Sequence, residues 1–139
     1  MTLAVGSNAD TIVGSGAWRG KVAVVTATRA CDGATADVSY TGVGFAPKAV
    51  LVVWVLQGNP NIGVQLWAPS VAGGFHSATK ASDTCGNFWS TNCVDCYPSG
   101  GGRQYGALKS FDADGMTISW IKTSSPASAT INLTFIFFG

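Results

Sequence analysis

Few side chains in this 139-residue chain have the chemistry that catalysis needs. His76 is the only histidine and all seven acidic residues are aspartates, so a nucleophile has little choice of base or orienting group. Ser77 follows His76 directly, but neighbouring residues of a strand point to opposite faces. Two aspartates could still meet in space as a carboxylate pair, although nothing in their spacing favours it. We therefore predict that the chain is not an enzyme and needs no cofactor.

The cysteines leave three states open. Cys85, Cys93 and Cys96 lie close together in the sequence, and Cys31 is distant. These four, or the first three with His76, could form a tetrahedral zinc site, but the chain contains a single CxxC pair, so the metal signal is weak. The same four residues could instead form two disulfides, or remain free buried thiols. In a protein made in a reducing cytoplasm, disulfides would form only after release.

Two kinds of motif resemble ligand-binding loops. Asp112-Ala113-Asp114-Gly115 has the alternate aspartates that begin a calcium loop, but the later glutamate ligand is missing. A tight turn with Gly115 at positive φ explains the same residues. The glycine clusters at 14–16, 42–44 and 100–102 precede no helical sequence, so we interpret them as turns and linkers rather than phosphate-binding loops.

Aromatic residues gather around the cysteine-rich segment. They could stack on sugars or anchor a protein partner, and core packing is the alternative explanation for most of them. The residues predicted to make outward contacts are Phe88, Trp89 and Tyr97.

The composition is 47% hydrophobic but only 11% charged, with a net charge of +1. Charge repulsion normally keeps domains apart. A chain with so few charges is therefore predicted to form a permanent homo-oligomer or to have an assembly partner. The basic residues are scattered along the chain, and nucleic acid is not expected as a partner.

No membrane contact is expected either. Met1 to Asp10 lacks the basic and long apolar regions of a secretory signal. The longest apolar run, Ala49 to Leu56, is far shorter than the roughly 20 residues of a membrane helix. We expect a soluble protein.

Strand patterns dominate the chain. Glutamate is absent, 18 glycines interrupt the sequence, and no long stretch has helical periodicity. Strands are expected at 21–28, 35–41, 49–56, 64–67, 116–120 and 130–138. Their length and spacing predict an all-β fold: one domain over 1–139, an antiparallel β-sandwich or jelly-roll-like structure. The polar, cysteine-containing segment from Gly73 to Arg103 is expected to be a long inserted loop.

Two strands are expected to supply the core and an interface. Ala49 to Leu56 has no polar position, which is typical of a strand covered on both sides, either inside a sandwich or at a subunit contact. In the last strand, alternate apolar residues share one face. The residues predicted for core and interface are Val50, Val52, Trp54, Phe135 and Phe137.

Two phrases of the sequence resemble a known group of proteins. The run Tyr40 to Val50, with its pattern TG-GF-PK-V leading into an apolar strand, is similar to a phrase met in small virion-associated proteins of tailed phages. The end of the chain, from Ser110 to Gly139, resembles the usual ending of the same proteins. The cysteine-rich middle has no such counterpart.

The resemblance implies a structural protein of the virion. It would be a capsid decoration (cement) protein that stabilises the particle, or alternatively a tail fibre, spike or receptor- or glycan-binding module. The implied partners are the major capsid protein and further copies of the chain, most simply a homotrimer. The protein would be made in the host cytoplasm and end on the capsid surface.

Overall fold

The computed structural model describes residues 20–58, 62–68, 71–77, 92–98 and 102–139, the segment 71–77 by its backbone alone. These residues form strands and turns, which confirms the all-β prediction. In chain order the strands are β1 (Val22–Ala30), β2 (Ala36–Thr41), β3 (Ala49–Leu56), β4 (Ile62–Ala68), β5 (Val71–Ser77), β6 (Asn92–Cys96), β7 (Arg103–Asp112), β8 (Gly115–Thr123) and β9 (Thr130–Phe138).

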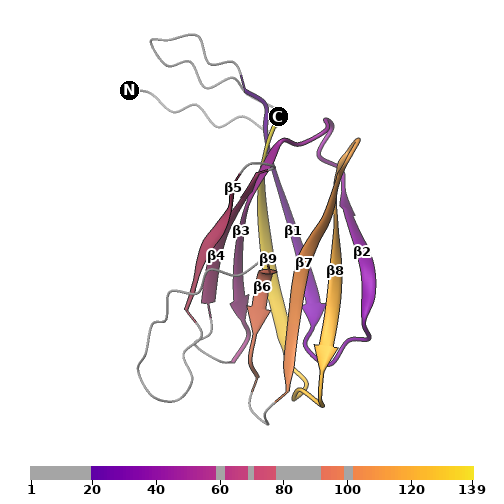
Figure 1. Cartoon of the computed structure of the whole chain (residues 1–139), viewed down its shortest axis with the longest axis vertical. Coiled ribbons are helices and arrows are strands. Elements are labelled where there is room, and N and C mark those ends of the chain that lie inside the picture. The colour runs from indigo at the N-terminus through magenta and orange to yellow at the C-terminus, as the bar shows by residue number, and fades with distance from the viewer. Residues whose placement is uncertain (1–19, 59–61, 69–70, 78–91, 99–101) are drawn as a thin grey trace.

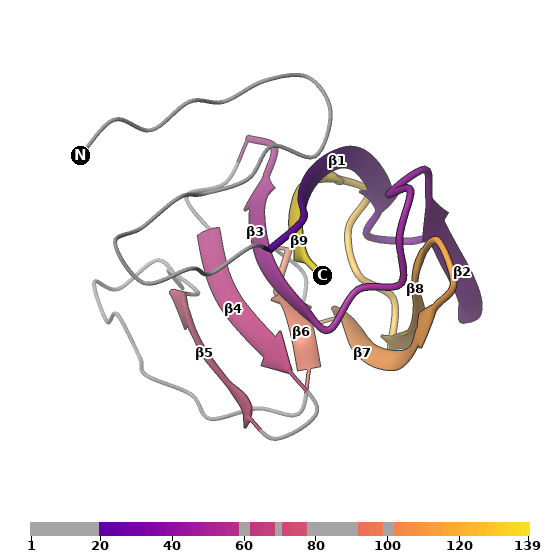
Figure 2. The ribbon, with the colours of Figure 1, turned by 90° about the horizontal axis from the view of Figure 1, so that it is seen from above.

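The strands form two antiparallel sheets that pack face to face as a β-sandwich (Figures 1 and 2). The first sheet has five strands in the order β1-β9-β3-β4-β5, and the second has four in the order β2-β8-β7-β6. The C-terminal strand β9 lies between β1 and β3 and pairs with both along its length. The last strand of the chain is therefore central to its sheet.

The core lies between the sheets and follows the two-residue period of the strands. In β3 and β9 the side chains of Val50, Val52, Trp54, Phe135 and Phe137 are fully buried within a single chain. They form the core, as predicted, but they have no exposed surface with which to contact a partner. The interface predicted for these residues must therefore be sought on other side chains.

One glycine allows a close contact inside this core. Gly63 of β4 lies directly opposite Trp54 of β3. A Cβ at Gly63 would lie 2.2 Å from the Trp54 indole, so only glycine leaves room for the ring. The bulky Trp54 side chain is accommodated at the expense of a side chain on the neighbouring strand.

The prediction of a long loop over 73–103 is wrong in part. β5 extends into this segment as far as Ser77, and Asn92–Cys96 forms β6. All five residues of β6 are buried, including the polar Asn92 and Asp95, because the strand lies on the edge of one sheet close to β4 and β3 of the other (Figure 2). Polar residues such as Asn92 and Asp95 favour a loop in the sequence, whereas in the structure they belong to a buried strand.

Candidate interaction surface

Over β1, β9, β3 and β4, the outer face of the five-stranded sheet, the side turned away from the core, is lined by uncharged and mostly apolar side chains. Strand pairing aligns three rows across β1, β9, β3 and β4, each with one residue from every strand. The rows are Val24, Ile136, Leu51 and Leu66; Thr26, Thr134, Val53 and Val64; and Thr28, Asn132, Val55 and Ile62. We call this surface the apolar face.

Large apolar side chains of this face are open to solvent in the single chain. Val24 is 61% exposed, and Val55, Ile62, Val64 and Leu66 are between 37% and 46% exposed. In β4 the usual arrangement is reversed, since Gln65 is buried while its apolar neighbours Val64 and Leu66 point outward. A strand that turns its apolar residues to water and a glutamine to the core is typical of a surface that a partner covers.

The outer face of the four-stranded sheet is different. Here Asp37 accepts hydrogen bonds from Lys109 (2.5 Å) and Ser119 (2.6 Å), and Ser39 and Thr117 share one of 2.8 Å. These polar side chains come from β2, β7 and β8, and they satisfy one another on an exposed surface. The bonds from Lys109 and Ser119 hold the pKa of Asp37 below its usual range. The protein thus has one polar, hydrated sheet face and one apolar face.

The apolar face is large enough to matter for association. Four strands about 4.8 Å apart and roughly 20 Å long cover about 400 Å², which is the scale at which exposed apolar patches mark interaction sites. A standard interface takes about 800 Å² from each partner, with an apolar centre and a polar rim. Val53, Val64 and Leu66 would occupy such a centre, and Thr28 and Asn132 would lie on its rim.

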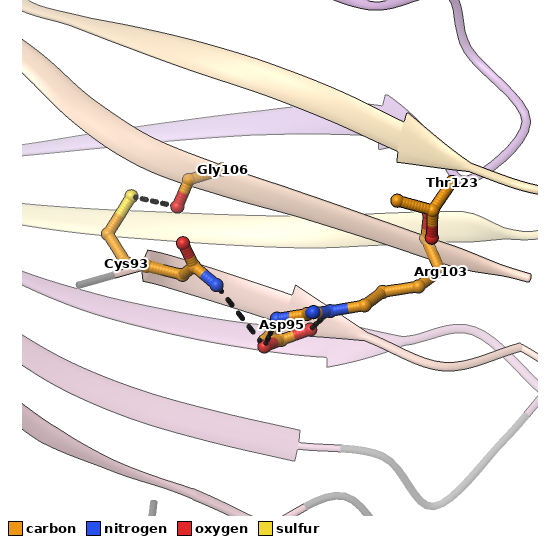
Figure 3. A network of polar contacts seen from close by, with 6 residues as sticks. Cys93, Asp95, Arg103, Gly106 and Thr123 are labelled. Carbon is orange, nitrogen blue, oxygen red and sulfur yellow. Dashed lines mark hydrogen bonds and ion pairs between the residues drawn. The ribbon is translucent and has the colours of Figure 1, made fainter. Parts of the chain in front are cut away.

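A second group of polar contacts lies on β6 and β7 (Figure 3). Arg103 donates to both carboxylate oxygens of Asp95, the bond from Nε being 2.6 Å long, and Asn92 donates to the same carboxylate at 3.4 Å. The side chain of Asp95 is only 4% exposed, against 31% for Arg103. This ion pair neutralises a carboxylate inside the protein, and the Asp95 bond raises the pKa of Arg103.

Two tyrosines flank the Arg103 guanidinium. Its carbon lies 4.4 Å from the centre of the Tyr105 ring and 5.3 Å from that of Tyr97. Tyr97 is 44% exposed, in agreement with its predicted outward position. Phe88 and Trp89, which are also predicted to make outward contacts, lie outside the described residues. Burial of part of the Tyr97 ring raises the pKa of its hydroxyl.

Cys31, Cys93 and Cys96 are buried free thiols, and Cys85 lies outside the described residues. Cys93 donates to the carbonyl oxygen of Gly106 at 3.1 Å, and burial raises the pKa of its thiol to about 12. The neighbouring Cys96 thiol lowers the pKa of Cys31, while burial raises that of Cys96. Within the described ranges, no group of three histidine, cysteine or acidic residues is arranged to hold a metal ion.

The predicted turn at Asp112-Ala113-Asp114-Gly115 is confirmed. Gly115 has a φ of +148°, and the segment connects β7 to β8. Asp112 accepts from Ser110 and Thr117, each at 2.7 Å, while Asp114 accepts from the backbone amides of Gly42 (3.0 Å) and Gly44. These bonds lower the pKa of both carboxyls and use their oxygens inside the protein. The aspartates therefore hold turns, and the calcium interpretation is not needed.

The remaining candidate for catalysis or zinc binding is His76. Its backbone lies in β5 opposite Gly63, and β5 is described by its backbone alone. Where the structure describes the chain, no helix is long and apolar enough to span a membrane.

Comparisons with known proteins give no relative. No protein-family model, no curated protein and no solved structure matches this chain.

Proposed function

We propose that this protein is a structural component of a tailed-phage particle, a decoration protein on the capsid surface that stabilises the shell. The observation that supports an assembly role is the apolar face, with Val24, Ile62 and Leu66 exposed and no charge in its three rows. The two sequence phrases that resemble virion proteins support the particle as its location. The proposal assigns the chain no catalytic step and no cofactor.

The occupant that we propose for the apolar face is another copy of the chain. An apolar sheet packs well against a second sheet of the same kind, about 10 Å away. Every copy presents the same uncharged surface and a net charge of only +1, so copies do not repel one another strongly. A partner with a charged surface would lose solvation there without gaining an ion pair. The chemistry of the face therefore favours self-association.

Such an oligomer would turn its apolar faces toward a symmetry axis and its polar sheets toward solvent. In a closed trimer, the arrangement implied by the resemblance, the apolar face of each copy meets the faces of both neighbours around the axis, in three identical contacts. The major capsid protein would then be bound through the remaining surface. Because several contacts must break together before the shell ruptures, each added copy would stabilise the particle.

The experiment that tests the particle role is a count of this chain per major capsid subunit in purified particles, by quantitative mass spectrometry. A decoration protein is expected at hundreds of copies per particle. A handful of copies would overturn the decoration role in favour of a tail position, and complete absence would overturn the virion proposal.

A second candidate function is a glycan-binding module of a fibre or spike. It is favoured by one observation, the exposed ring of Tyr97 held beside Arg103, since sugars stack on aromatic rings that are presented in a fixed position. A glycan array probed with the full chain and with its Tyr97→Ala variant distinguishes the glycan-binding function from the decoration function. Binding that is lost in the variant supports the adhesin, and an array without any binding to the full chain removes it.

A further inference from the structure

The described thiols differ in what surrounds them, and one pair lies at a junction between the two sheets. Cys31 directly follows β1 of the five-stranded sheet, where its amide donates to the carbonyl oxygen of Ala129 at 2.8 Å. Cys96 is the last residue of β6 in the four-stranded sheet. Both ends lie at the same pole of the sandwich in Figure 1.

Gln104 connects these two residues. It lies directly opposite Cys96 in the β6–β7 pair. With its amide nitrogen as the donor, its side chain hydrogen-bonds the carbonyl oxygens of Cys31 (2.6 Å) and Gly33 (3.2 Å). Gln104 is fully buried, so this bridge between the sheets is protected from water. Its bonds hold the Cys31 backbone close to the strand position that faces Cys96, at the end of β6.

We propose that Cys31 and Cys96 form a disulfide that links the two sheets when the protein leaves a reducing environment. Both cysteines are fully buried free thiols, and Gln104, which lies opposite Cys96 and bonds the Cys31 carbonyl oxygen, brings the two residues to the same point between the sheets. Cys93 is the contrasting case, since its thiol lies on the same strand but donates to the Gly106 carbonyl. This inference stands independently of the proposed function, because it follows from where Gln104 places these two residues.

The chemistry needs an oxidant, and a low-molecular-weight disulfide such as oxidised glutathione supplies it. A local opening of the turn after β1 exposes the buried Cys31 thiol, whose thiolate attacks one sulfur of that disulfide and releases one glutathione thiolate. The Cys96 thiolate then attacks the mixed disulfide at Cys31 and releases the second glutathione. Two protein thiols lose two protons and two electrons, and one small disulfide becomes two thiols. The neighbouring Cys96 thiol lowers the pKa of Cys31 and burial raises that of Cys96, so Cys31 is the first nucleophile.

The test uses the full chain, purified reduced and then incubated with oxidised glutathione. Remaining thiols are blocked with N-ethylmaleimide in acid denaturant and counted by mass spectrometry. Two thiols are expected to be protected, and the product should run as a monomer on a non-reducing denaturing gel. Oxidation should raise the thermal midpoint by about 10 °C, because the crosslink closes a long loop.

Variants identify the cysteines, since Cys85, Cys93 and Cys96 share one tryptic peptide between Lys80 and Arg103. Cys31→Ala and Cys96→Ala should abolish both the protection and the shift in midpoint, whereas the matched control Cys93→Ala should keep both. Each variant is compared with its own reduced form, so a loss of stability from the substitution itself does not affect the result. The wild-type linked peptide gives an independent reading. Four free thiols after oxidation, or protection that persists in Cys96→Ala and is lost in Cys93→Ala, would overturn the proposal.

Discussion

The carboxylate of Asp114 accepts a hydrogen bond from the backbone amide of Gly42, 3.0 Å away, although 72 residues separate them. The other carboxylate oxygen accepts from Gly44, and the Val43 amide donates to the Asp114 carbonyl at 3.5 Å. One aspartate thus fastens the turn after β2 to the β7–β8 turn. The turn at 42–44 and the turn at 112–115 thus contact each other, and Asp114 helps to hold the fold together.

Asp114→Ala should lower the urea midpoint of unfolding at pH 7. Its lowered pKa means that the folded state favours the ionised carboxylate. This contribution is present above the unfolded pKa of about 3.9 and is lost as the pH falls through the lower folded pKa. The difference between variant and wild type should therefore shrink below about pH 4. Asp32→Ala is the control, since Asp32 interacts with Lys122 through its carbonyl oxygen. A difference that is constant down to pH 2 would contradict this role.

Gly115→Ala should destabilise the protein far more than Gly42→Ala. Both glycines have positive φ, but a Cβ at Gly115 would lie 1.9 Å from the Tyr40 carbonyl oxygen, while one at Gly42 meets nothing within 4 Å. Backbone strain alone predicts about 1 kcal/mol for Gly42→Ala, and strain with the clash predicts more than about 3 kcal/mol for Gly115→Ala. Chemical denaturation measures both. Equal losses would show that the clash relaxes without cost.

Removal of one partner of the buried ion pair should cost more than removal of both charges. Arg103→Gln leaves the Asp95 carboxylate buried without its cation, which predicts a loss of about 3 kcal/mol in the free energy of unfolding. The double variant Asp95→Asn with Arg103→Gln should recover part of this loss, because no charge is then buried alone. A double-mutant cycle by urea denaturation measures the coupling. Strictly additive losses would contradict a coupled pair.

The sequence predicts the parts of the fold that depend on local alternation. In β2, Asp37 and Ser39 face solvent while Tyr40 is buried, as their period of two requires. The β7–β8 turn was predicted for a similar reason, since Asp114-Gly115 has a strong local preference.

Features that depend on distant partners were not predictable. β6 resembles a loop because Asn92 and Asp95 are polar, and only Arg103 makes burial of the Asp95 carboxylate acceptable. The direction in which Val64 and Leu66 point is the reverse of what local alternation predicts, because the glutamine between them, Gln65, is on the buried face. The sequence therefore does not predict the apolar face, which forms only when strand pairing aligns its three rows.

The central claim is that the apolar face is buried between copies of the chain, and the most direct measurement is the mass of the protein in solution by sedimentation equilibrium. Wild type is expected at three times the chain mass of 14.2 kDa. Val64→Lys with Leu66→Lys places charges at the centre of the face and should give a folded monomer. Thr41→Lys, an exposed position on the other sheet, is the matched control and should keep the wild-type mass. A monomeric wild type, or an oligomer unchanged by the two lysines on the apolar face, would contradict the account.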